Sequence, residues 1–235
     1  MPGPDYTIFA VTDLSMHTSL QDGDDSFLAS YRKGARLASK GEDMEDDSRE
    51  GQVDSTYGFD DFLQNMDIIL CGRGTYDQVM TRHQGQWPYP SQRLIVFSET
   101  PLDQPVPTSN APVYPLPANA TAFGGTPQEL VNKLSKEGVK SRRFKRSSVW
   151  VLGGPTVRGA MLQLGVVERV ELVMVPTIMR RANTTGGNGG VPLWAFPANE
   201  EGGSTNQEDV RLELIDCRSY ENGVVALSYS VISNA

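Results

Sequence analysis

Short apolar runs alternate with amphipathic patterns along most of the chain. Residues 68–71 and 94–97 are continuous apolar runs, of the kind found in strands that are buried on both faces of a sheet. Strands are also predicted at 6–11, 149–152 and 170–175. Strands and helical patterns mostly alternate, with about eight strands and five helices in all. This order predicts an α/β domain with a largely parallel sheet.

Two helices are predicted from apolar residues that recur at helical spacing, one over 27–38 and one over 59–66. A further helix is marked by its own first turn. Thr126 and Glu129 form a capping box, with a proline at the first helical position between them. This helix is expected to end at Gly138, because glycine commonly follows the last turn of a helix.

The last part of the sequence predicts an antiparallel hairpin. Two β-rich runs, 210–219 and 224–232, are joined through Asn222 and Gly223, and the Asn-Gly pair is typical of hairpin turns. No long linker and no repeat divides the chain. We therefore expect a single domain over residues 1–235.

One long stretch, residues 180–209, shows no periodicity and contains six glycines. Loops of this length are usually functional or mobile. The stretch is predicted to order over a bound ligand, with Leu193 and Trp194 as its apolar anchor. Trp87 and Trp194 are also candidates for lining a ligand pocket, and packing under loops is an equal alternative for both.

Composition narrows the classes of function. The net charge is −8, which argues against nucleic-acid binding and against a role at a membrane surface. No apolar run approaches the ~20 residues of a membrane span. The acidic residues gather in 42–54, which is expected to be an exposed loop rather than a metal site. The two cysteines, Cys71 and Cys217, exclude a disulfide framework and favour the reducing cytoplasm.

The first candidate site is a junction between a strand and a helix. Gly72 and Gly74 allow a sharp turn and a close approach of backbone to a ligand, and Arg73 lies between them. Thr75 and Gln78 match a capping box, so the helix is predicted to begin there. Unpaired N–H groups and a guanidinium would suit a phosphate. The alternative interpretation is a plain turn with a solvated arginine.

A second junction has the same form. The strand at 149–152 runs into Gly153 and Gly154, and Pro155 can occupy the first helical position before Thr156 and Val157. The pair of glycines matches neither the three-glycine dinucleotide fingerprint nor the phosphate-binding loop with its lysine. Two such junctions at the carboxyl ends of different strands nevertheless favour one extended ligand. No His/Asp/Glu cluster shows zinc spacing, so no metal site is predicted.

Several short motifs, taken in order, resemble one family. CGRGTY at 71–76 resembles the G-R-x-T-Y of dihydrofolate-reductase-like proteins, and in particular their riboflavin-biosynthesis reductase (RibD C-terminal) branch. VLGG at 151–154 resembles that branch's second glycine motif, GVVERV at 165–170 its G-L-V-D-E-L, and GNGGVPLW at 187–194 its G-x-G-x-P-L-F. The resemblance implies a dihydrofolate-reductase-like three-layer α/β/α fold, NADPH binding and often a homodimer.

The resemblance also implies roles for particular residues. Asp13 is the candidate for substrate orientation or proton delivery, and Ser98 would approach the adenosine ribose or 2′-phosphate. The expected phosphate-binding residues are Gly72, Arg73, Gly74, Thr75, Gly153, Gly154, Pro155, Thr156 and Val157. Because NADH has no 2′-phosphate, Arg73 is expected to favour NADPH by about ten- to 150-fold.

The sequence also departs from the family. The S-L-D-G motif that usually follows the first strand is missing, since residues 11–17 read VTDLSMH. His17 in this stretch could face a substrate or serve as an ordinary surface or hydrogen-bonded histidine. Insertions near 40–56 and 180–188 lie outside the usual pattern. The leading hypothesis is a reductase that passes a hydride from NADPH to a C=N or C=O group of a small molecule. The alternative is a non-catalytic dinucleotide-binding or dimeric scaffold protein that kept the fold.

Overall fold

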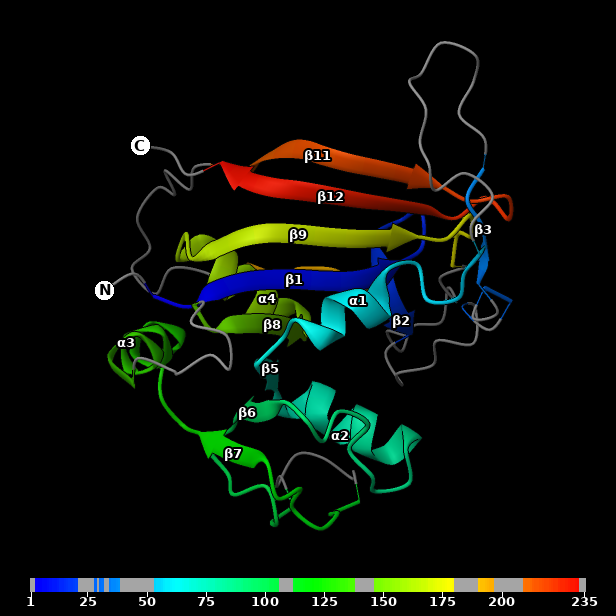
Figure 1. Ribbon diagram of the computed structural model, residues 1–235. Coiled ribbons are helices and arrows are strands. Elements are labelled where there is room, and N and C mark those ends of the chain that lie inside the picture. Colours follow the sequence, from blue (N-terminus) through cyan, green and yellow to red (C-terminus); the bar gives the residue numbers. More distant parts are fainter. Residues whose placement is uncertain are drawn as a thin grey trace, which may run out of the picture.

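The computed structural model describes residues 3–20, 28, 30–31, 34–38, 53–105, 112–137, 146–179, 190–196 and 209–232. Most of the predicted acidic loop and most of the long glycine-rich stretch lie outside these residues. Within them, eight strands form one sheet in the order β11-β12-β9-β1-β8-β5-β6-β7 (Figure 1). The strands are β1 (Asp5–Thr12), β5 (Ile68–Gly72), β6 (Arg93–Phe97), β7 (Ala120–Phe123), β8 (Ser148–Gly153), β9 (Val167–Met174), β11 (Arg211–Ser219) and β12 (Val225–Ile232).

The sheet is mostly parallel, as the alternating pattern predicts. β1 lies at its centre and pairs in parallel with β8 on one side and with β9 on the other. β5, β6 and β7 extend the parallel part beyond β8. Among the described strands of this sheet, β12 alone runs in the opposite direction to the others. It pairs antiparallel with β9 on one side and, in the C-terminal hairpin, with β11 on the other.

Helices cover both faces of the sheet. The described helices are α1 (Phe59–Gln64), α2 (Arg73–Arg82), α3 (Pro127–Glu137) and α4 (Pro155–Gln163). Alternate side chains of β1 point to opposite faces, so Tyr6 and Ile8 join one core with Leu130 of α3 and Met161 of α4. Phe9 joins the other core, against α1 and α2. The three-layer α/β/α arrangement is therefore confirmed.

Two small sheets lie outside the main one. β2 (His17–Leu20) pairs with β10 (Gly190–Pro192), and β3 (Ala35–Arg36) pairs with β4 (Val53–Asp54). The helix predicted over 27–38 is therefore wrong at its C-terminal end. Ala35 and Leu37 both pack against the core two positions apart, which is the period of a strand. Pairing with β4 is a non-local contact, and it outweighs the local helical spacing.

Two local signals in the sequence are confirmed in detail. The backbone N–H of Thr126 donates to Glu129 Oε2 at 2.8 Å, and that of Glu129 donates to Thr126 Oγ1 at 3.2 Å, so the capping box is formed. The hairpin turns through Asn222 and Gly223, whose φ is +82°. The predicted start of α2 at Thr75 is wrong, because the helix begins at Arg73 and its cap makes no side-chain hydrogen bond.

Candidate functional site

The two glycine junctions meet at one edge of the sheet. β5 and β8 are parallel neighbours, so α2 and α4 both begin at the same edge. A Cβ atom placed on Gly72 would lie 3.3 Å from Val157 Cγ2, and one placed on Gly154 would lie 3.2 Å from Thr75 Oγ1. Each junction thus leaves just enough space for the other, which explains glycine at both positions. The expectation that the two junctions come together is confirmed.

A cavity of about 660 Å³ lies at these junctions. This volume is in the usual range for small-molecule and cofactor sites. Seven of the residues predicted to bind the cofactor line it: Gly72, Gly74, Thr75, Gly154, Pro155, Thr156 and Val157. Gly153 is buried behind them, and Arg73 and Ser98 are not among the lining residues.

The first turns of α2 and α4 supply hydrogen-bond donors at the cavity. Their N-cap residues are Gly72 and Gly154, and neither cap makes a side-chain hydrogen bond. The first N–H groups of a helix have no partner within the helix, and together with the helix dipole they attract anions. A Cβ placed on Gly74 would meet no atom within 4 Å. The two helix starts and this open approach fit the pyrophosphate of a dinucleotide.

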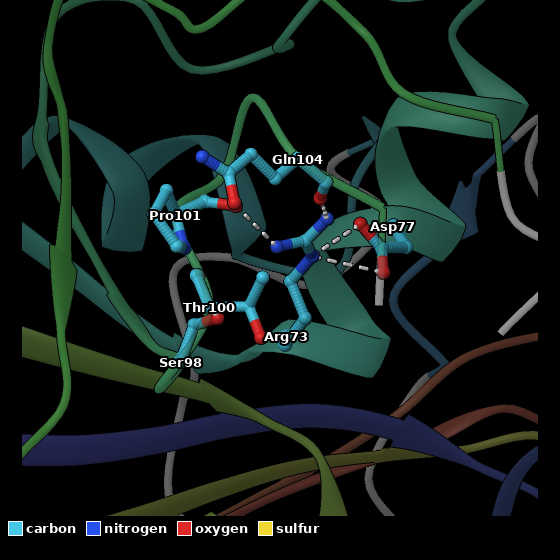
Figure 2. Close-up of polar contacts among 6 residues, drawn as sticks. All are labelled: Arg73, Asp77, Ser98, Thr100, Pro101 and Gln104. Carbon is cyan, nitrogen blue, oxygen red and sulfur yellow. Dashed lines mark hydrogen bonds and ion pairs between the residues drawn. The ribbon is translucent and has the colours of Figure 1, made fainter. Parts of the chain in front are cut away.

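Arg73 is bound within the protein (Figure 2). Its Nε donates to both carboxylate oxygens of Asp77, at 2.8 and 3.0 Å, one helical turn further along α2. Its Nη1 donates to the carbonyl oxygen of Pro101 at 3.1 Å, and its Nη2 to that of Gln104 at 2.9 Å. All three nitrogens already have acceptors, so the alternative of a solvated arginine is wrong. Its role as a phosphate ligand stays a prediction, and it visibly holds the loop after β6.

Ser98 lies at the start of the same loop. Its Oγ donates to the carbonyl oxygen of Thr100 at 2.5 Å (Figure 2). Its N–H donates to the carbonyl oxygen of Phe123 at 3.1 Å. The side chain therefore closes a local turn in this structure. Its predicted contact with the adenosine end of a cofactor is untested.

Asp13 is fully buried and bound on both oxygens. Oδ1 accepts the backbone N–H groups of Ser15 at 2.9 Å and His17 at 2.8 Å, and Oδ2 accepts that of Met179 at 2.8 Å. The His17 ring lies beside it, with 3.5 Å between His17 Nδ1 and Asp13 Oδ1. Neither residue lines the cavity. The proposed role of Asp13 in substrate orientation or proton delivery stays untested, and its contacts hold together the segments after β1 and β9.

Aromatic side chains form a second part of the cavity wall, and the sequence did not single them out. The Trp150 ring centroid lies 5.4 Å from that of Phe59 and 5.3 Å from that of Tyr89, and its indole N–H donates to the carbonyl oxygen of Phe9 at 3.2 Å. All four residues line the cavity. Each looks like an ordinary core residue in the sequence, and only the fold brings them together.

Two predicted pocket residues lie elsewhere. Trp87 packs against Tyr76, with 6.0 Å between ring centroids, and it does not line the cavity. Trp194 packs against the core of the opposite face. For both, the packing alternative is confirmed. Leu193 is 1% exposed and belongs to that core, which agrees with its expected place as an apolar anchor. The closing motion predicted for 180–209 is untested.

The charged groups of the cavity wall are basic. Arg82 and Arg158 line it, and no Asp or Glu does so in the part of the chain that the structure describes. Arg158 is buried, and it donates from Nε and Nη2 to the carbonyl oxygen of Leu152 and from Nη1 to that of Leu193. Burial away from water lowers the pKa of this guanidinium to about 10. The cavity therefore favours neutral or anionic ligands over cations.

Two further findings concern the described residues as a whole. They contain no helix that is long and apolar enough to cross a membrane. They also contain no group of three or more His, Cys, Asp or Glu side chains placed to hold a metal ion.

The fold and its cavity define the class of protein. A mostly parallel eight-stranded sheet with a C-terminal antiparallel hairpin, covered on both faces and open at its carboxyl edge, is the dihydrofolate-reductase-like fold. The family model described as the RibD C-terminal domain matches residues 35–226. The chain belongs to the RibD C-terminal domain family.

Individual relatives are distant but cover most of the chain. The uncharacterized protein YyaP of Bacillus subtilis is 24% identical over 187 residues, which are 75% of this chain and 80% of that protein. Among solved structures, a putative riboflavin biosynthesis protein from Shewanella sp. PV-4 has a TM-score of 0.62 and 16% identity, over 97% of this chain and 99% of that one. At these identities the solved structures support the fold, while the family match supports a reductase-type function.

The name of a third similar structure states the reactions of that protein. It is the diaminohydroxyphosphoribosylaminopyrimidine deaminase/5-amino-6-(5-phosphoribosylamino)uracil reductase of Thermotoga maritima, with a TM-score of 0.55 and 12% identity. The match covers 98% of this chain and 57% of that one. The present chain therefore spans little more than half of that protein.

Proposed function

We propose that this protein is an NADPH-dependent reductase that transfers a hydride to a C=N or C=O group of a small molecule. The observation that carries the proposal is the meeting of two glycine junctions, each the start of a helix, at one cavity. A plain α/β domain needs no such convergence of two helix starts at one cavity. Family membership adds support, because RibD C-terminal and dihydrofolate-reductase-like proteins use NADPH.

The residues of the cavity suggest how they would hold the cofactor. N–H groups in the first turns of α2 and α4 would bind the pyrophosphate, and Gly74 and Gly154 would let the backbone come close to it. NADPH, when bound, supplies the hydride. The aromatic wall of Phe9, Phe59 and Trp150 would exclude water from the reacting groups, which strengthens polar interactions there.

Calorimetric titration with NADPH tests the proposal directly. We expect binding to the wild-type protein and a loss of at least about 50-fold in affinity for Gly154→Val, because the added atoms must displace Thr75 or enter the cavity. Gly124→Ala is the matched control, since its Cβ would make only ordinary contacts, at 3.6 Å, outside the cavity. Absence of binding to the wild type at millimolar NADPH, or equal binding by Gly154→Val, would disprove the proposal.

A second function is favoured by one observation. The structure places no carboxylate in the described cavity wall, and Asp13 is bound by three backbone N–H groups. A non-catalytic dinucleotide-binding or dimeric scaffold protein would need no acid in the cavity. The two functions differ in a simple measurement. A scaffold would bind NADPH and never oxidise it with any acceptor, whereas a reductase would consume NADPH with its substrate.

We also propose a two-fold homodimer. β11 is an edge strand, and Leu214 and Ile215 on it are 52% and 51% exposed, with Ile232 of β12 at 45%. An exposed apolar edge of this kind is typical of a surface that pairs with another chain. Light scattering at micromolar concentration should give twice the chain mass of 25.7 kDa, and Leu214→Lys should lower it to the chain mass. A mass near 26 kDa for the wild type would contradict the dimer.

A further inference from the structure

The cavity wall beside the glycine junctions consists largely of flat apolar surfaces. Phe59 and Tyr89 stand edge-on to Trp150, with ring centroids 5.4 and 5.3 Å away, and Phe9 lies beneath Phe59 at 5.2 Å. Valines from the ends of β1 and β9, Val11 and Val173, continue this wall. Planar ligands gain most from such a surface, because aromatic pairs add stabilisation beyond the apolar area they bury.

Two tyrosine hydroxyl groups in this region are already engaged. The Tyr57 hydroxyl donates to the carbonyl oxygen of Tyr31 at 2.6 Å and accepts from Asn222 Nδ2 at 2.8 Å. The Tyr31 hydroxyl is paired with Thr177 Oγ1 at 3.2 Å. A heterocycle with many N–H donors would lose its water here and could not use these two hydroxyl groups, and each donor left unpaired costs free energy. The described wall also lacks carboxylates that could accept from such a ring.

The lack of an acid also limits the chemistry. Reduction of an isolated ketone leaves an alkoxide, whose conjugate acid is nearly as weak as water, with a pKa of about 15.7, so a strong proton donor helps. Reduction of a conjugated carbonyl leaves a charge spread over the ring. Hydride transfer to a quinone gives an anion that resembles a phenolate. Because the conjugate phenol has a pKa of about 10, water suffices to protonate this anion.

From these observations we infer that the substrate is a planar, uncharged, largely apolar ring compound with a conjugated carbonyl, of the quinone type. The inference rests on the proposed reductase function and names its substrate class. The reaction balances as a two-electron reduction. One hydride from NADPH and one proton from water convert the quinone to the hydroquinone, and NADPH becomes NADP⁺.

The probe for the experiment is 2-methyl-1,4-naphthoquinone, with dihydrofolate as the polar, charged comparison. NADPH oxidation by the full chain should be at least about tenfold more efficient, as kcat/KM, with the quinone. A reaction without protein corrects for direct reduction. Calorimetry of the quinone against the cofactor-free protein should show binding. Equal or greater efficiency with dihydrofolate would overturn the inference, and so would absence of quinone binding.

A matched pair of variants shows whether the aromatic wall is responsible. Phe59 and Phe62 share helix α1 and contact the same rings, with Trp150 at 5.4 and 5.6 Å and Phe9 at 5.2 and 4.8 Å, but only Phe59 lines the cavity. Phe59→Leu should raise KM for the quinone about three- to tenfold, and Phe62→Leu less than about twofold. Equal effects would contradict the inference.

Failure of the proposed function looks different from failure of this inference. If NADPH does not bind in the absence of any acceptor, the reductase function falls, and the quinone-binding calorimetry still decides the ring chemistry. If NADPH binds and dihydrofolate is the better acceptor, the reductase function stands and the quinone class falls.

Discussion

Each glycine junction carries an arginine, and the protein uses the two side chains in different ways. Arg73, on the first turn of α2, has a carboxylate partner in Asp77 and ties down the loop 98–104 through two carbonyl oxygens. Arg158, on α4, is buried and bonds the carbonyl oxygens of Leu152 and Leu193. The charge of Arg73 is paired with the opposite charge of a carboxylate. The charge of Arg158 is stabilised only by the dipoles of backbone carbonyl groups.

The difference shows that an arginine beside a glycine turn can have a structural role. Only Arg73 was expected to bind a phosphate, yet both residues connect the helix start to a distant segment. Arg158 joins the end of β8 to the residue after β10, and Arg73 joins α2 to the loop that follows β6. Gly72, Gly74 and Gly154 line the cavity, and we propose that the backbone N–H groups of the two helix starts face the ligand there.

The largest effect is expected from Arg158→Ala. The substitution leaves the carbonyl oxygens of Leu152 and Leu193 without these donors and opens a void under Gly153. We expect the free energy of unfolding to fall by about 3–5 kcal/mol. Urea denaturation monitored by circular dichroism measures it. A loss below ~1 kcal/mol would mean that Arg158 holds nothing together and is available to a ligand.

Arg73→Ala should cost less, about 2–4 kcal/mol, because it leaves the nearly buried Asp77 carboxylate unpaired. The double variant with both Arg73→Ala and Asp77→Ala should recover part of this lost stability, because it leaves no unpaired carboxylate. Since Arg73 holds the loop through two carbonyl oxygens, we expect its loss to weaken the binding of NADPH and NADH alike. Calorimetry with both cofactors checks this. A loss confined to NADPH would restore the interpretation of Arg73 as the 2′-phosphate clamp.

Gly74→Ala should separate the structural role of the junction from its binding role. Alanine is the better helix former, and its Cβ would meet no protein atom, so we expect a gain of about 0.5–1 kcal/mol in stability. The same methyl group would stand at the approach to α2, so NADPH should bind about five- to tenfold more weakly. Higher stability with unchanged affinity would place the pyrophosphate away from α2.

The smallest effect concerns pH. Burial lowers the pKa of Arg158 to about 10, so between about 10 and 12.5 the unfolded chain holds a proton that the folded protein has lost. Wild-type stability then rises with pH relative to a variant without this group. The difference between wild type and Arg158→Ala should grow by roughly 0.5–1 kcal/mol from about pH 9.5 to 10.5. A constant difference would show that the carbonyl oxygens of Leu152 and Leu193 keep the buried guanidinium charged over this pH range.

Much of the fold follows from local rules. The buried runs at 68–71 and 94–97 became β5 and β6, and Thr126 with Glu129 capped α3 through both expected bonds. The meeting of the glycine junctions was also predictable, because parallel strands end at a common edge. The helix expected over 27–38 is wrong at its C-terminal end because β3 depends on pairing with β4, and helical spacing carries no information about a partner strand.

The chemistry of the site was harder to foresee. The Arg73–Asp77 pair has a signal in the sequence, since residues four apart face each other on a helix. The carbonyl oxygens of Pro101 and Gln104 have none, because every residue carries one. The aromatic wall joins positions from β1, α1 and β8, and each of its residues looks like core on its own.

The place of β1 at the centre of the sheet affects how the protein is made. Both of its neighbours come late in the chain, since Asp5 pairs with Ser148 and Tyr6 with Val167. On the ribosome, β1 therefore waits with both edges open until β8 and β9 have emerged, and contacts so distant in sequence slow folding. Among the described residues the cavity wall is complete only once Val191 has been made, and a ligand that binds there can stabilise only a chain that has reached this stage.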